Sequence, residues 1–107
     1  MSVDMRQNDK VTVYIPTGLP RSDEVIRWVE TRLSEELGGA TEVTKEANGS
    51  WINPETGELV HDTVSMVHSF GSDIPSELVE EIGRYVKDTL NEDAVLIEKS
   101  TANVAFV

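Results

Sequence analysis

Residues 41–70 read TEVTKEANGSWINPETGELVHDTVSMVHSF, and the fold of the chain depends on how this stretch pairs with itself. Two runs within it, 41–52 and 59–70, are rich in β-branched residues and alternate between apolar and polar side chains. Residues 53–58 between them contain the asparagine, proline and glycine that are typical of a turn. The stretch therefore predicts a long β-hairpin.

The same alternation predicts the register of this hairpin. Pairing Ile52 with Leu59 leads, further along, to a pair between Val43 and His68. A slip of one residue would mix the apolar and polar faces, so this register is preferred. The apolar face, which we expect the helices to cover, carries Val43, Ala47, Trp51, Val60, Val64, Met66 and Phe70. The other face is polar and mostly uncharged, and it carries Thr44, Glu46, Asn48, Ser50, His61, Thr63, Ser65 and Ser69.

A strand and a helix are expected before the hairpin. Residues 11–15 alternate with period two and are followed by a turn that contains two prolines. Ser22 is a suitable N-cap for a helix that ends at the Gly38-Gly39 pair. One face of this helix is apolar and carries Val25, Ile26, Val29, Leu33 and Leu37.

A second helix and two short strands are expected after the hairpin. Asp73 is the expected cap of the helix, and Pro75 is tolerated in its first turn. Residues 94–98 and 104–107 have the composition of strands, with a turn between them. The apolar face of the helix carries Ile74, Leu78, Ile82, Val86 and Leu90.

The expected element order is β-α-β-β-α-β plus a C-terminal strand. With right-handed crossovers this is the ferredoxin-like split β-α-β arrangement, an α+β two-layer sandwich with two helices on one face of an antiparallel sheet. We expect residues 1–10 to form a mobile N-terminal arm, because they are polar and lack periodicity. Residues 11–107 are expected to form a single domain.

The composition is strongly acidic, since 20 Asp and Glu oppose 9 Lys and Arg and give a net charge of −11. Residues 1–54 carry nine acidic and six basic side chains, whereas residues 55–107 carry eleven and three. Two interpretations are open: adaptation to high salt, or an acidic surface that mimics nucleic acid and binds a basic protein. We favour salt adaptation, because the acids are spread along the chain. Direct binding of nucleic acid is disfavoured, because its phosphates would be repelled.

The composition also excludes several kinds of site. The chain has no cysteine, which rules out disulfides, thiolate zinc sites and cysteine nucleophiles. No run approaches the roughly 18 apolar residues of a membrane span, and the N-terminus lacks the apolar core of a signal peptide. No glycine motif for nucleotides is present. We therefore expect a cytoplasmic protein of a high-salt cell interior, with no cofactor and no membrane partner.

His61, Asp62 and His68 form the one group that hints at catalysis or metal binding. The two histidines are seven positions apart and point to opposite faces of a regular strand, so we expect no metal site and assign no catalytic residue. If the protein has a small-molecule pocket, His68 and Trp51 are its candidate residues. The candidate contacts on the open sheet face are Tyr14, Glu46, His61 and Ser65.

Five segments, taken together, resemble a known group of proteins. They are residues 11–17 (VTVYIPT), 38–41 (GGAT), 49–51 (GSW), 57–60 (GELV) and 64–69 (VSMVHS). The combination resembles a group of small uncharacterised proteins of haloarchaea and their plasmids and viruses, and it extends over about residues 11–99. The resemblance implies a similar α+β fold and a high-salt habitat, and it implies no particular activity.

The sequence favours a non-catalytic interaction or accessory protein. We expect it to self-associate through its open sheet face or an edge strand, as a homo-oligomer such as a dimer, or to bind another protein. One alternative is a small-molecule enzyme that uses His68 or His61 as an acid or base. The second alternative is the acidic nucleic-acid mimic, acting through the Glu-rich second helix.

Overall fold

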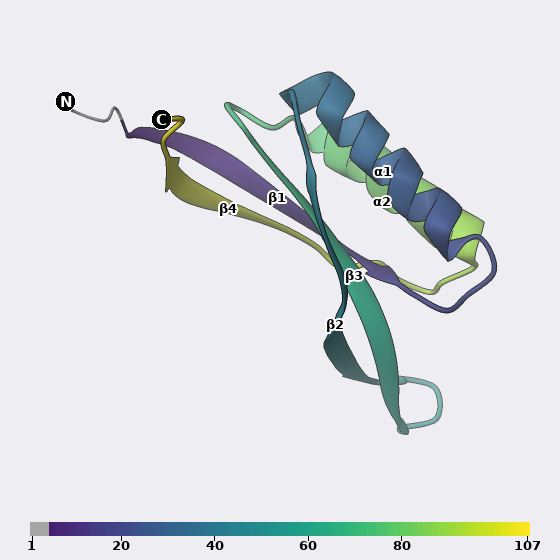
Figure 1. The fold of residues 1–107 in the computed structure, drawn as a ribbon. Helices are drawn as coiled ribbons and strands as arrows, with labels where there is room; N and C mark the ends of the chain where they lie inside the picture. Colours follow the sequence, from purple (N-terminus) through teal and green to yellow (C-terminus); the bar gives the residue numbers. More distant parts are fainter. Residues whose placement is uncertain (1–4) are drawn as a thin grey trace.

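The structure is a computed structural model that describes residues 5–107, with all their side chains except those of residues 44–46. The described chain forms two helices and a four-stranded sheet (Figure 1). In order, the elements are β1 Arg6–Pro16, α1 Ser22–Leu37, β2 Thr41–Ile52, β3 Leu59–Gly71, α2 Ser76–Leu90 and β4 Ile97–Val104.

The sheet has the strand order β2-β3-β1-β4, and all its pairs are antiparallel. Both helices lie on one of its faces (Figure 1), which confirms the ferredoxin-like split β-α-β arrangement expected from the sequence. Within the described residues, no helix has both the length and the apolar character that a membrane crossing needs. The apolar faces predicted for the helices are confirmed, because the core contains Val25, Ile26, Val29, Leu33, Ile74, Leu78, Ile82, Val86 and Leu90.

The N-terminal segment differs from the expected mobile arm. β1 begins at Arg6, because residues 6–10 pair with β4 and the pairing with β3 starts at Asp9. These residues therefore belong to the sheet and to the domain. Residues 1–4 lie outside the described part of the chain.

The C-terminal segment also differs from the expectation. One strand, β4, replaces the two short strands predicted at residues 94–98 and 104–107. It runs without interruption through the predicted turn, because residues 97–104 pair continuously with β1. The ladder with β1 therefore overrides the turn-like composition of this stretch.

The predicted hairpin register holds from Ile52 to Ala47. The register then shifts between Val43 and Ala47, so Val43 lies opposite Met66 and not opposite His68. Such a shift is a β-bulge or a related irregularity on β2, which places extra residues against the partner strand.

The helices cover the hairpin face that was predicted to be open. Residues that pair directly across antiparallel strands point to the same side of the sheet. The buried face of β1 consists of Val11, Val13 and Ile15. Their partners on β3, in the same order, are Ser69, Val67 and Ser65, and these three are buried too. The prediction of the buried face was therefore wrong, and the apolar set of the hairpin lies on the uncovered side.

Small residues on β3 allow α1 to approach the sheet closely. The Ser69 hydroxyl donates a hydrogen bond to the carbonyl of Gly39, which follows α1. A Cβ atom placed on Gly71 would lie 2.7 Å from Cδ2 of Leu37, well inside van der Waals contact. The buried face of β3 is thus decided by its pairing with β1 and by the close packing of α1 against it. The alternation of side chains within the hairpin does not decide it.

The molecule is elongated because the sheet extends past the helices (Figure 1). Its dimensions are 56 × 24 × 23 Å and its radius of gyration is 15.2 Å. A compact domain of about 100 residues has a radius of gyration of about 13 Å. The outer end of the β2–β3 hairpin therefore has no helix packed against it.

Candidate functional site

The sheet face opposite the helices is the candidate interaction site, and we call it the open face. It is formed by alternate residues of the four strands, and paired residues stand side by side on it. One row across the strands contains Val43, Met66 and Tyr14, and the next contains Thr41, His68 and Thr12. The apolar residues of β2 and β3 on this face are Val43, Ala47, Trp51, Val60, Val64, Met66 and Phe70.

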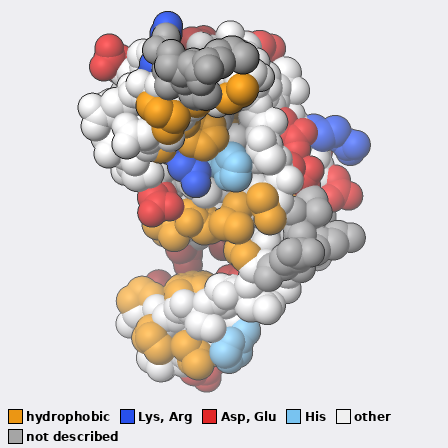
Figure 2. All heavy atoms as spheres, turned by 60° about the vertical axis from the view of Figure 1, so that its left-hand side comes forward, with side chains coloured by type: hydrophobic (Ala, Val, Ile, Leu, Met, Phe, Trp, Pro, Cys, Tyr) orange, Lys and Arg blue, Asp and Glu red, His pale blue; other side chains and the backbone are white. Residues whose placement is uncertain are grey.

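The open face carries little net charge, in contrast to the chain as a whole. Among its described strand residues, Arg6 and Lys10 are basic, and Asp62 and Glu98 are acidic. The whole chain has a net charge of −11. Figure 2 shows one side of the molecule on which hydrophobic side chains gather above and below a hollow, with acidic side chains at the margins and inside the hollow.

His68 lies near the centre of the open face. Its ring meets the ring of Phe70 edge-on, with 5.9 Å between the ring centroids. Nζ of Lys10 lies over the same Phe70 ring, 5.8 Å from its centroid. Partial burial, and then the positive charge of Lys10, lower the pKa of His68. The imidazole is therefore mostly neutral at pH 7.

Tyr14 and Glu98 join β1 to β4 on the open face. The Tyr14 hydroxyl donates a hydrogen bond to Oε1 of Glu98 over 3.2 Å. Burial, and then this carboxylate, raise the pKa of Tyr14, so the phenol stays protonated. Thr12, which pairs with both His68 and Glu98, is only 5% exposed because longer side chains surround it. The side chains at the centre of the face already pack against one another.

A second apolar group lies at the outer end of the hairpin. Trp51, Ile52 and Leu59 are 38%, 59% and 55% exposed. The indole N–H of Trp51 donates a hydrogen bond to Oδ2 of Asp62 over 2.8 Å, which fixes the ring along the hairpin. Large apolar side chains that are exposed together are typical of interaction surfaces.

Of the residues predicted to line the open face, Tyr14 lies there and two others do not. Ser65 is 1% exposed and packs beneath the helices, opposite to the expectation. His61 follows the same alternation along β3, so it too points to the other side, where Nδ1 lies 3.0 Å from the Ser50 hydroxyl. The side chain of Glu46 lies outside the described residues.

The residues of the candidate pocket, His68 and Trp51, are far apart. Trp51 pairs with Val60, which is eight positions before His68 on β3. At the rise of a β-strand this separation is about 26 Å. The two histidines lie on opposite sides of β3, as their spacing predicted. Among the described residues, no group of three His, Asp or Glu side chains is arranged to hold a metal ion.

Lys10 and Glu98 are residues of the open face that sequence reasoning missed. Lys10 fell within the predicted mobile arm, although it pairs with Phe70 on β3 and Ser100 on β4. Glu98 belongs to the same row as His68, with Thr12 between them. The sequence carries no local signal for this group, because only the pairing of β1 with two other strands brings it together.

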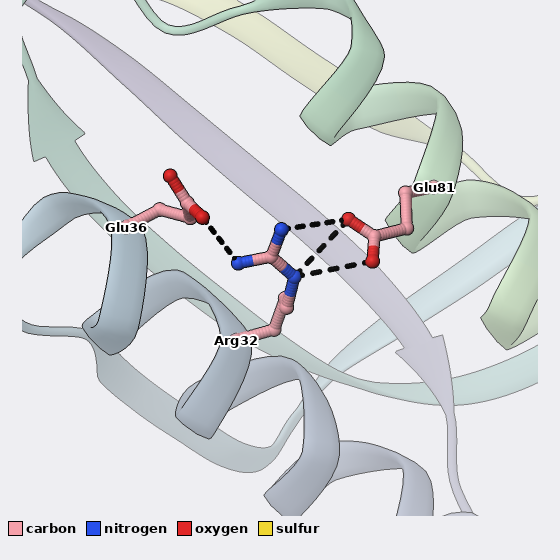
Figure 3. A network of polar contacts seen from close by, with 3 residues as sticks. All are labelled: Arg32, Glu36 and Glu81. Atoms are coloured by element: carbon pink, nitrogen blue, oxygen red, sulfur yellow. Dashed lines mark hydrogen bonds and ion pairs between the residues drawn. The ribbon is translucent and has the colours of Figure 1, made fainter.

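The helix side of the molecule is held by an arginine between two carboxylates (Figure 3). Nη1 of Arg32 lies 2.7 Å from Oε1 of Glu36 on the same helix, and Nη2 lies 3.0 Å from Oε2 of Glu81 on α2. The hydrogen bonds to Glu81 and then to Glu36 raise the pKa of Arg32. This network ties α1 to α2.

A shallow groove of about 560 Å³ lies beside this network. The rings of Trp28 and Tyr85 stack there with their centroids 3.9 Å apart. Most of the other residues that line the groove are acidic. These other residues are Glu77, Glu80, Glu81, Arg84, Asp88 and Thr89.

No family model matches the chain, and no curated protein matches it. Several solved structures are similar to it. A divalent cation tolerance protein (CutA1) from Thermus thermophilus has a TM-score of 0.59 and 16% identity, over 89% of this chain and 82% of that chain. A phage SAM lyase in complex with S-methyl-5'-thioadenosine has a TM-score of 0.64 and 12% identity, over 92% of this chain and 90% of that chain.

The GlnK–ATP complex of B. subtilis is also similar, with a TM-score of 0.61 and 14% identity over 90% of this chain and 82% of that chain. Such low identity shows a common fold and nothing more specific. The similarity agrees with the split β-α-β arrangement described above.

Proposed function

We propose that the protein is a non-catalytic, salt-adapted accessory protein that self-associates through the open face of its sheet. The observation that carries this proposal is the apolar content of a sheet face that no described helix covers. Val43, Val64 and Met66 are only partly buried there. An antiparallel sheet with one free face normally turns polar residues to water on that side. An apolar free face therefore supports a partner that covers it.

A second copy of the chain is the partner that the charges favour. The open face has equal numbers of described acidic and basic strand residues, whereas the chain carries −11. Two copies that meet through this face keep their acidic surfaces apart, which limits repulsion. The exposed Trp51 at the hairpin end extends the apolar area of this face, whereas Ile52 and Leu59, which pair with each other, point to the other side of the sheet.

The alternative function, a small-molecule enzyme, is supported by some observations and disfavoured by another. In its favour, His68 is a neutral imidazole next to a lysine, and two of the similar structures contain ATP or S-methyl-5'-thioadenosine. Against it, the groove beside α2 and a second groove beside α1 are lined by neither histidine. Its test is calorimetric titration with ATP and S-methyl-5'-thioadenosine, in which binding that His68→Gln abolishes would support the alternative.

The acidic-mimic alternative rests on the carboxylates around the α2 groove. These side chains all project from α2. Their negative charge is neutralised in part by the ion pair between Arg32 and Glu81. A basic protein that co-purifies with the chain, and is lost when Glu77 and Glu80 are replaced by glutamine, would favour this alternative over self-association.

The self-association proposal is tested by sedimentation velocity in molar salt with a matched pair of variants. Met66→Lys places a charge at the centre of the open face and should shift the protein to the monomer. Leu19→Lys makes a similar change at a 38% exposed residue in the turn before α1, and should leave the assembly intact. Circular dichroism checks that both variants are folded. A wild-type protein that is monomeric in molar salt, with no partner bound, would contradict the proposal.

A further inference from the structure

His68 is a titratable side chain at the centre of the open face, and charged groups approach it from particular strands. On β1, Lys10 contacts the same Phe70 ring that His68 contacts, and Thr12 is the residue paired directly with His68. On β2, the paired residue is the uncharged Thr41. The helices lie on the other face of the sheet and present no charged group to this side.

The nearest carboxylate in the same row is Glu98 on β4, and it is poorly placed to neutralise a charge on His68. Thr12 separates Glu98 from His68 in the register of the sheet. Glu98 also accepts a hydrogen bond from Tyr14. Among the side chains that the structure describes, a protonated His68 would therefore stand beside Lys10 with no carboxylate paired to it.

Two neighbouring positive charges cost little free energy on a solvated surface and much more within an interface from which water is excluded. Water screens the repulsion between two neighbouring cations on an exposed face. Once a second copy covers the face, an unpaired charge loses its hydration, and the repulsion is less screened. The neutral imidazole, in contrast, packs against Phe70 without such a cost.

We propose that His68 acts as a pH-sensitive switch of self-association, in which protonation of its imidazole beside Lys10 separates the copies of the chain. This inference rests on the proposed function, because it concerns the same face. In the free chain, partial burial and then Lys10 already lower the pKa of His68, which favours the neutral imidazole that self-association requires. Association deepens the burial and lowers that pKa further.

The sign of the pH dependence follows from this linkage. Because association lowers the pKa of His68, assembly releases a proton and is strongest above the pKa of the free chain. Below that pKa the association constant falls, by up to about tenfold per pH unit for each histidine buried. Protonation of the many carboxylates has the opposite tendency, since it reduces the overall repulsion. A comparison of variants is therefore needed to isolate His68.

The test is sedimentation equilibrium in molar salt at about pH 8 and about pH 5, which span the titration of histidine. His68→Gln removes the titrating group, and His61→Gln is the matched control on the other face of the same strand. We expect the wild type and His61→Gln to associate at least about tenfold more weakly at the lower pH. We expect His68→Gln to lose this difference and Lys10→Gln to reduce it. Circular dichroism at each pH verifies that the chain stays folded.

The outcomes separate the two proposals. A pH dependence of association that is the same in His68→Gln as in the wild type would overturn the switch and leave self-association standing. A wild type that is monomeric at both pH values would overturn self-association and the switch together.

Discussion

The Ser65 hydroxyl is buried between sheet and helices and has no hydrogen-bond partner among the described residues. Ser69, four positions further along the same face of β3, donates a hydrogen bond to the carbonyl of Gly39. A buried hydroxyl without a partner loses its hydrogen bonds to water and gains none in return. The two serines are therefore buried in similar places, but burial of the hydroxyl destabilises the fold at Ser65 and is compensated by a hydrogen bond at Ser69.

At Ser65 we expect Ser65→Ala to raise the free energy of unfolding by about 1 kcal/mol, because it removes an unpaired polar group. The matched variant Ser69→Ala should lower it by about 1 kcal/mol, because it breaks a hydrogen bond. Urea unfolding followed by circular dichroism measures both. Equal losses in the two variants would show that Ser65 has a partner in solution, such as a bound water.

At the scale of elements, the long hairpin shows both the reach and the limit of local patterns. Alternation predicted two strands, the turn between them and the register from Ile52 to Ala47. It assigned the wrong face to the core, because serines occupy the buried side of β3 and leave room for α1. A rule that places the more apolar face inside fails when a neighbouring helix comes this close to a strand.

The contact between the helices depends on Arg32, which binds one carboxylate on each helix. We expect Arg32→Gln to lower the urea midpoint of unfolding, because it breaks both ion pairs and leaves Glu36 and Glu81 to repel each other. Arg27→Gln, an exposed position on the same helix, removes the same charge and is the control.

The difference between these two variants should shrink as salt is added, since salt screens exposed ion pairs. Urea titrations at low and molar salt measure it. The same loss in both variants would mean that overall charge, and not the link between α1 and α2, sets the stability.

At the scale of the whole molecule, charge and shape act together. The chain carries −11 and is 56 Å long, and most apolar residues of β2 and β3 lie on the open face. Repulsion between copies opposes association through that face and is screened within about 10 Å at 0.1 M salt and about 3 Å at 1 M.

We therefore expect self-association to strengthen as salt is raised from low to molar concentration, because screening removes the repulsion and salt also strengthens apolar contacts. Sedimentation equilibrium over a salt series measures this. An assembly held mainly by ion pairs between copies would weaken with salt, and such a result would contradict an apolar interface.

The sequence alone determined the local elements and the fold class of this protein. The apolar spacing of the two helices, the hairpin and the split β-α-β order all follow from periodicity and turn residues, which act over a few positions. Only the tertiary structure decided that residues 6–10 belong to the sheet, that one strand replaces two near the C-terminus, and that His68 meets Lys10 on the open face. These features depend on β1 pairing with strands far away in the chain, and no local pattern encodes such a choice.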